Sequence, residues 1–340
     1  MEKVKTVKGL SAISSTDMKR IMLVIIMIIF AIIANIINPK FLTLANMINI
    51  LYQYSVVGVM AVGMMMIIVT GGIDLSMGYS VAFGAIVCGT VFTNTGNVWL
   101  SILAAILSCT LIGFVNGIII TKMRIAPFIA TLATMSLTQG ALNMVGSGLR
   151  LMLDHEVFHV IGKSYVFGIS TETIIMVIVM ITGAVVLNKT KFGAYIYAIG
   201  SDENNARLAG INIDKYKIIT YSIGGFCVGI ASILLGSKLT LVMQSSAGSA
   251  QLMDCIAAVV IGGTSMSGGS GKISGTFLGV ILLGMIGNML TLLKIPTVAQ
   301  DFFKGLVIIL ALALSLFSSL IQKRNALKAE LQVGHQANNA

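Results

Sequence analysis

The stretch NKTKFGAYIYAIGSDENNARLAGINIDKYK, residues 188–217, is the feature from which the fold of this chain follows. It carries eight charges, five basic and three acidic, although only 10% of the whole chain is charged. Uninterrupted apolar runs stand on both sides of it, at 173–188 and 218–237. A polar segment between two such runs predicts a loop outside the lipid with a transmembrane helix on either side.

The composition extends this pattern to the rest of the chain. With 340 residues, 56% hydrophobic, and a mean hydropathy of +0.97, it is too apolar for a soluble domain, whose surface must be covered with polar groups. A helix needs roughly 20 apolar residues to cross about 30 Å of hydrocarbon. Charge-free runs of this kind, with the two short runs on either side of Asp254 merged into one span, predict an all-α polytopic membrane protein with about ten transmembrane helices, some broken or short. The expected spans are 21–39, 41–73, two within 75–121, 125–149, 173–188, 218–237, one across 239–271, 273–293 and 305–322.

Lysine and arginine indicate the orientation, because they accumulate on the cytoplasmic side of membrane proteins. With the N-terminus inside, sixteen of the 22 lie on inner segments and six on outer ones. This predicts that both termini are cytoplasmic, with a cytoplasmic N-terminal segment (1–20), a single transmembrane domain (21–322) that contains the cytoplasmic loop 188–217, and a cytoplasmic polar tail (323–340). Because the net charge of +10 sits at membrane boundaries rather than on one soluble face, we expect no nucleic-acid binding.

One motif points to an enzyme. His155, Glu156 and His159 form a literal HExxH, the spacing that in metalloproteases holds zinc between two imidazoles and places a glutamate beside it. The one other histidine, His335, lies in the tail on the other side of the predicted membrane, and the nearest later acid, Glu172, stands at the edge of the next span. We therefore expect an external loop and no metal, and a membrane metalloprotease is the weakest alternative. The four cysteines lie in apolar runs without a CxxC spacing, so no cofactor is expected either.

Two glycine-rich stretches interrupt the apolar runs. In TGGIDLSMG, residues 70–78, the glycines allow a helix to end, and Asp74 with Ser76 can cap the next helix or contact a solute. The second stretch, VVIGGTSMSGGSGKISG at 259–275, fails as a phosphate loop because Met266 and Ile273 stand where a glycine and a hydroxyl are needed. Paired glycine-rich breaks are typical of transporters, in which half-helices line a cavity.

The expected fifth span is rich in polar side chains. Pro127 stands just inside its predicted start, where a missing N–H group costs little. Hydroxyl and amide groups follow along the span, and lipid would leave them unsatisfied, so we expect them to face other helices or water: Thr131, Thr134, Ser136, Thr138, Gln139 and Asn143.

Four segments together resemble one known family. They are TGGIDLSMG (70–78), APFIATLATMS (126–136), AIGSDENNARLAGINIDKYKIITYSIGG (198–225) and CIAAVVIGGTSMSGGSGKISGTFLG (255–279). They look like the ribose-type permeases, of the branched-chain amino acid/ribose superfamily, that serve sugar ATP-binding-cassette (ABC) importers. The similarity runs in order from about residue 38 to residue 312.

The resemblance implies a permease subunit in the inner membrane of a bacterium, which imports a ribose-like monosaccharide by alternating access. The implied partners are a second permease subunit, identical or related, two cytoplasmic ATPase subunits and an extracytoplasmic sugar-binding protein. ATP hydrolysis would then belong to the ATPases, and this chain would not be an enzyme. An ion-coupled secondary carrier is the alternative, and it would transport without ATP.

The resemblance also assigns roles to residues. It makes 188–217 the loop that couples the permease to the ATPase, where the pattern G-x-x-E-x-x-x-R-x-x-G-I falls on Gly200, Glu203, Arg207, Gly210 and Ile211. Spaced i, i+4, Glu203 and Arg207 can share one face of a short helix, to which Ala206 and Leu208 add apolar contact. The candidate translocation path is Asp74, Ser76, Phe128, Thr131 and Thr134.

The sequence departs from the family pattern before the second glycine-rich stretch. Leu252 stands where the pattern places an acid, whereas Asp254 is present. This departure leaves the identity of the sugar open.

Overall fold

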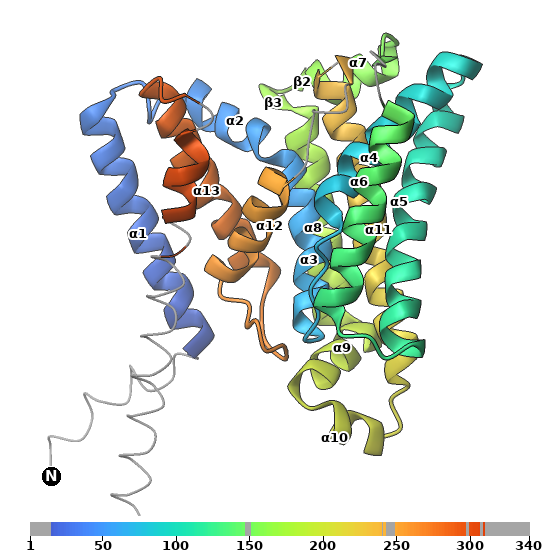
Figure 1. Cartoon of the computed structure of the whole chain (residues 1–340). Coiled ribbons are helices and arrows are strands. Elements are labelled where there is room, and N and C mark those ends of the chain that lie inside the picture. Colours follow the sequence, from blue (N-terminus) through green and yellow to red (C-terminus); the bar gives the residue numbers. More distant parts are fainter. Residues whose placement is uncertain are drawn as a thin grey trace, which may run out of the picture.

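The computed structural model describes residues 15–146, 151–239, 241–242, 249–296, 299–306 and 309, and within them the chain is almost entirely helical (Figure 1). The elements are α1 (Ser15–Ile37), α2 (Leu44–Gln53), α3 (Ser55–Val69), α4 (Met77–Thr95), α5 (Val98–Lys122), α6 (Pro127–Gly146), β1 (Leu151–Met152), α7 (Glu156–Lys163), β2 (Tyr165–Val166), β3 (Ile169–Ser170), α8 (Thr171–Lys189), α9 (Lys191–Ser201), α10 (Glu203–Leu208), α11 (Ile213–Leu239), β4 (Leu241–Val242), α12 (Ser249–Ile261) and α13 (Ile273–Leu292).

The helices confirm a polytopic membrane protein. Among the described residues, seven helices are long and apolar enough to cross a membrane. The pair α2 and α3 meets the same criteria together, with a bend of 50° between the two helices. The bend falls at Tyr54, between α2 and α3. The tenth expected span, 305–322, and the tail, 323–340, lie almost wholly outside the described residues, as do residues 1–14.

The span expected across 239–271 is not one helix. Among the residues described between the end of α11 and Lys272, only α12, with 13 residues, is helical, and a helix of that length rises about 20 Å, short of the hydrocarbon core. The chain then continues without regular structure to Lys272, through Gly263, Gly268 and Gly269, all with positive φ angles. Counting apolar residues cannot detect this ending, because glycine and serine interrupt a helix without adding charge.

Helix α3 is the centre of the molecule. Every one of its residues is buried, and it packs against α8, α11, α12 and α13. An apolar helix without a polar face needs neighbours on all sides or lipid, and here other helices of the chain surround it.

Helices α5 and α11 pack closely through glycines. A Cβ atom at Gly113 would overlap the carbonyl oxygen of Tyr221, and one at Gly225 would overlap that of Cys109. Small residues let two membrane helices bring their backbones together, and the dispersion gained replaces the hydrophobic drive that lipid does not provide.

The polar segments lie at opposite ends of the helix bundle (Figure 1). Helix α7 and the β2–β3 pair form one end, where β1 also pairs antiparallel with β4. Helices α9 and α10 form the other end. These four two-residue strands are the one departure from an all-α architecture among the described residues.

Candidate functional site

Helix α10 is a short helix with a defined start and end. Asp202 caps its start, because its Oδ1 accepts a hydrogen bond from the Asn205 amide at 2.9 Å. At its end the amides of Gly210 and Ile211 donate to the carbonyls of Arg207 and Ala206, which is the Schellman arrangement. Gly210 has a φ of 79°, a left-handed conformation that glycine adopts without a Cβ penalty.

Helix α10 is held against α11 by charge and by a small apolar cluster. Glu203 accepts a hydrogen bond from Lys217 at 2.6 Å and lies 3.7 Å from Arg207, its neighbour one turn along. Ala206 is buried with Ile199 and Ile213, and Ile211 packs against them. Leu208, in contrast, is 86% exposed. Of the two residues expected to supply apolar contact to a partner, only Leu208 faces outward.

Gly200 joins this segment to both glycine-rich breaks. A Cβ atom there would overlap the carbonyl oxygen of Val69, at the end of α3, and would lie 2.7 Å from the amide of Gly269. The Gly269 amide itself donates to the Val69 carbonyl at 2.9 Å. The backbones of the loop 188–217, the end of α3 before the first break, and the second break therefore meet at one point.

Tyr197 strengthens the same junction. Its hydroxyl donates to the Gly271 carbonyl at 2.7 Å, which fixes α9 to the second break. Burial raises the pKa of Tyr197 above its ordinary value, so the phenol stays protonated and able to donate.

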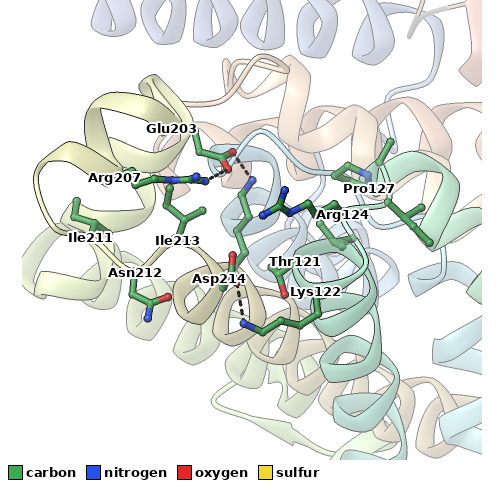
Figure 2. A pocket seen from close by; sticks show the side chains of 14 residues that line it. Thr121, Lys122, Arg124, Pro127, Glu203, Arg207, Ile211, Asn212, Ile213 and Asp214 are labelled. Carbon is green, nitrogen blue, oxygen red and sulfur yellow. Dashed lines mark hydrogen bonds and ion pairs between the residues drawn. The ribbon is translucent and has the colours of Figure 1, made fainter.

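A pocket of about 740 Å³ opens where α10, the start of α11, the end of α5 and the start of α6 meet (Figure 2). Four cations and two acids line it. Lys122 pairs with Asp214 at 2.8 Å, and Glu203 engages Lys217 and Arg207. The fourth cation, Arg124, belongs to the turn between α5 and α6 and is joined by no dashed line in Figure 2.

Two of the candidate path residues lie together inside the bundle. Asp74 is 1% exposed, and its Oδ1 accepts hydrogen bonds from the amide and the hydroxyl of Ser76 at 2.9 and 2.6 Å. Asn116 of α5 completes the cluster, since its amide donates to Ser76 Oγ at 3.0 Å and to Asp74 at 3.3 Å. An asparagine in the middle of an apolar span could have drawn attention to this partner.

The remaining candidates lie on α6, which begins at Pro127 as predicted. Thr131 and Thr134 are buried, and Thr131 also approaches the carbonyl of Ile73, the residue before Asp74, at 3.4 Å. Thr134 donates within its own helix, to Ala130 at 3.2 Å. Phe128 is 56% exposed and does not join the cluster.

The HExxH stretch takes another arrangement. His155 is the N-cap of α7, and its Nδ1 accepts from the Val157 amide at 3.2 Å, whereas His159 pairs with Asp154 at 2.8 Å. In the part of the chain that the structure describes, histidine, cysteine and acidic side chains nowhere gather in groups of three that could hold a metal ion. The stretch works there as a helix start at the end of the bundle opposite α10.

Two comparisons with known proteins agree with each other. The family model described as "Branched-chain amino acid transport system / permease component" matches residues 46–312. The ribose import permease protein of Bacillus subtilis (strain 168) is 40% identical over 290 residues, covering 84% of this chain and 89% of that protein. That of Escherichia coli (strain K12) is 38% identical over 293 residues, covering 85% and 91%. The L-arabinose transport system permease protein of the same strain is 34% identical over 290 residues, covering 85% and 88%.

Proposed function

This chain belongs to the branched-chain amino acid transport system permease component family, and from that premise we propose how it imports a sugar. It is a permease subunit of a sugar ABC importer in the bacterial inner membrane. The relatives are transport permeases and not enzymes, so ATP hydrolysis belongs to a separate subunit. An ATPase and an extracytoplasmic sugar-binding protein are its implied partners.

In our proposal two permease subunits and two ATPases form the working importer, and α10 is the contact between them. The observation that carries this assignment is the geometry of α10, a helix capped at both ends that presents Leu208 and Arg207 outward while Glu203 ties it to α11. A rigid, amphipathic surface helix is the kind of element that can dock into a groove of a partner. This end of the molecule then faces the cytoplasm, with both termini on the same side.

Gly200 supports a route from the ATPase to the translocation path. When ATP binding closes the ATPases, α10 and α9 move with them, and Gly200 transmits that movement to the ends of both glycine-rich breaks. The first break leads directly to Asp74, Ser76 and Asn116. Alternating access follows if these breaks adopt one arrangement when the path is open outward and another when it is open inward.

Reconstitution tests the transport class. Liposomes that contain the chain with its ATPase and binding protein should accumulate labelled monosaccharide only when ATP is supplied, and ribose and arabinose can be compared directly. Uptake by the chain alone under an ion gradient would instead establish a secondary carrier. Zinc-dependent proteolysis lost in Glu156→Ala would establish the membrane metalloprotease.

The docking assignment predicts a loss of ATPase binding. We expect Leu208→Ala alone, and Glu203→Ala with Arg207→Ala together, to weaken capture of the ATPase about tenfold, as truncation of central interface residues does. Leu208→Ala is the cleaner variant because the exposed side chain has no role in packing. Phe167→Ala, an exposed residue at the opposite end, is the matched control. Unchanged ATPase binding in both variants would refute the assignment.

A further inference from the structure

Arg124 carries a positive charge that no other described residue pairs with. Its side chain is exposed, and no hydrogen bond or ion pair with the other described residues engages the guanidinium. Its φ of 55° places it in the left-handed region, which costs a residue with a Cβ of order 1 kcal/mol. Strained residues of this kind gather at sites that clamp ligands. The neighbouring pocket is the place where such a ligand would lie.

Other groups besides Arg124 make the pocket positively charged. Its four cations outnumber its two acids, and both acids already pair with cations of the pocket. Helices α6 and α11 both begin at the pocket, so the partial positive charge of two helix starts adds to that of the side chains. The arrangement favours an anion over a neutral or cationic ligand.

The expected depth of the pocket in the membrane restricts the kind of anion that it can bind. The candidate membrane spans of α5, α6 and α11 end or begin at Lys122, Pro127 and Ile213, and all three residues line the pocket. Because a transmembrane helix ends near the edge of the hydrocarbon core, we expect the pocket at the level of the lipid headgroups. Beside its lining residues the chain exposes large apolar side chains at Met123, Phe128 and Ile129, which an acyl chain would cover.

We propose that this pocket binds the phosphate headgroup of an anionic phospholipid, with Arg124 as the principal contact and Arg207 and Lys122 at its margin. Basic pockets between transmembrane helices on the cytoplasmic side are typical sites for such headgroups. An acidic segment of a protein partner would account for the charge but would leave the apolar rim uncovered. The proposal goes beyond ATP-driven transport and holds even if α10 does not contact an ATPase.

Native mass spectrometry of the full purified chain can test the site. The chain is titrated with phosphatidylglycerol or with phosphatidylcholine that carries the same acyl chains. We expect tighter binding of phosphatidylglycerol, and an about fivefold loss of that affinity in Arg124→Asn, the effect of one basic side chain near an anionic membrane surface. Phosphatidylcholine binding should not change.

The choice of variants separates a binding role from a structural one. Asparagine tolerates a positive φ better than arginine, so the thermal stability of Arg124→Asn should be equal to or higher than that of the parent chain. Arg124→Lys should recover most of the affinity because it restores the charge. Lys163→Gln, at an exposed position on α7 at the opposite end, should bind phosphatidylglycerol like the parent chain.

Four results would overturn the proposal. Equal binding of the two lipids would remove the anionic preference, and a preference that survives Arg124→Asn would place the lipid elsewhere. Displacement of the bound lipid by soluble glycerol phosphate at matched concentration would identify a free phosphate compound as the ligand. A loss of ATPase binding in Arg124→Asn without any loss of lipid binding would assign the pocket to a protein partner.

Discussion

At the scale of single residues, buried charges set the strongest constraints. Glu172, at the start of α8, is 0% exposed and lies 3.6 Å from Lys238, near the end of α11. Neither carboxylate oxygen of Glu172 has a hydrogen bond among the described residues. The positive charge of Lys238 is therefore the group that compensates the buried negative charge in this part of the structure. Lys238 also donates to the Tyr52 carbonyl at 2.9 Å and lies 3.9 Å above the ring of that tyrosine. One ion pair thereby joins α2, α8 and α11.

Breaking this pair from one side should therefore destabilise the protein. We expect Lys238→Met to lower the free energy of unfolding by about 3–5 kcal/mol, because it leaves the Glu172 carboxylate buried and uncompensated unless that group takes up a proton. Adding Glu172→Gln to Lys238→Met should recover most of the loss. Denaturant unfolding in detergent measures both, with Lys163→Met as the exposed control. Equal stability of the single and double variants would show that the pair is not coupled.

Asp74 offers a second prediction at this scale. In Asp74→Leu the amide and the hydroxyl of Ser76 lose their buried acceptor, which costs about 1–3 kcal/mol for each unsatisfied group. Asp74→Asn keeps one acceptor oxygen and the shape of the side chain. If the cluster also serves the translocation path, ATP-driven uptake should fall in Asp74→Asn while the melting temperature changes little. If uptake falls only in proportion to the loss of melting temperature in both variants, Asp74 has a capping role alone.

At the scale of elements, the contact of α9 with the two glycine-rich breaks is the proposed route of coupling. Gly200 is the position where backbone meets backbone, and the neighbouring groups are carbonyl and amide atoms of Val69 and Gly269. Such atoms cannot turn aside as the end of a flexible side chain can. A methyl group at Gly200 must therefore push α9 away from α3.

Gly200→Ala should accordingly separate ATP hydrolysis from transport. We expect the chain to insert in the membrane and to bind the ATPase through α10, while sugar uptake for each ATP hydrolysed falls by about tenfold or more. Gly140→Ala is the matched control, because a Cβ atom at that position of α6 meets nothing within 4 Å. Normal uptake in Gly200→Ala would show that movement of α9 is not transmitted through this contact.

At the scale of the whole molecule, the two polar ends of the bundle lie on opposite sides of the apolar helices, and in our proposal the α10 end faces the cytoplasm. Phe167, between β2 and β3, and Leu208, on α10, are both exposed and lie at opposite ends of the bundle (Figure 1). The four native cysteines are buried, which leaves little background for thiol labelling. These features allow a direct test of the orientation.

In intact spheroplasts a membrane-impermeant maleimide should label Phe167→Cys and not Leu208→Cys. Permeabilised cells should give labelling of both, which serves as the control for exposure. The reason is that the ATPase acts in the cytoplasm and the proposed coupling helix must be on the same side. Labelling of Leu208→Cys in intact spheroplasts would invert the proposed topology.

The sequence alone determined the membrane class, the position of most helices and the place of the short helix α10. Apolar length, charge asymmetry, capping residues and the Gly200 to Ile211 pattern are properties of neighbouring residues, so they can be read along the chain. The same reasoning grouped Asp74 with Ser76, which are two residues apart. It could not predict that Asn116, on another helix, contacts both of them.

Only the tertiary structure decided how these local features act together. In the structure the helix in the expected eighth span, α12, is too short to cross the membrane, and on α10 Leu208 is exposed whereas Ala206 is buried. The tertiary structure also brought Gly200 against Val69 and Gly269. It placed Arg124 beside a pocket, where no other described residue pairs with the guanidinium. Each of these depends on distances between residues far apart in the chain, and such distances follow from helix packing, which a one-dimensional pattern of polarity does not contain.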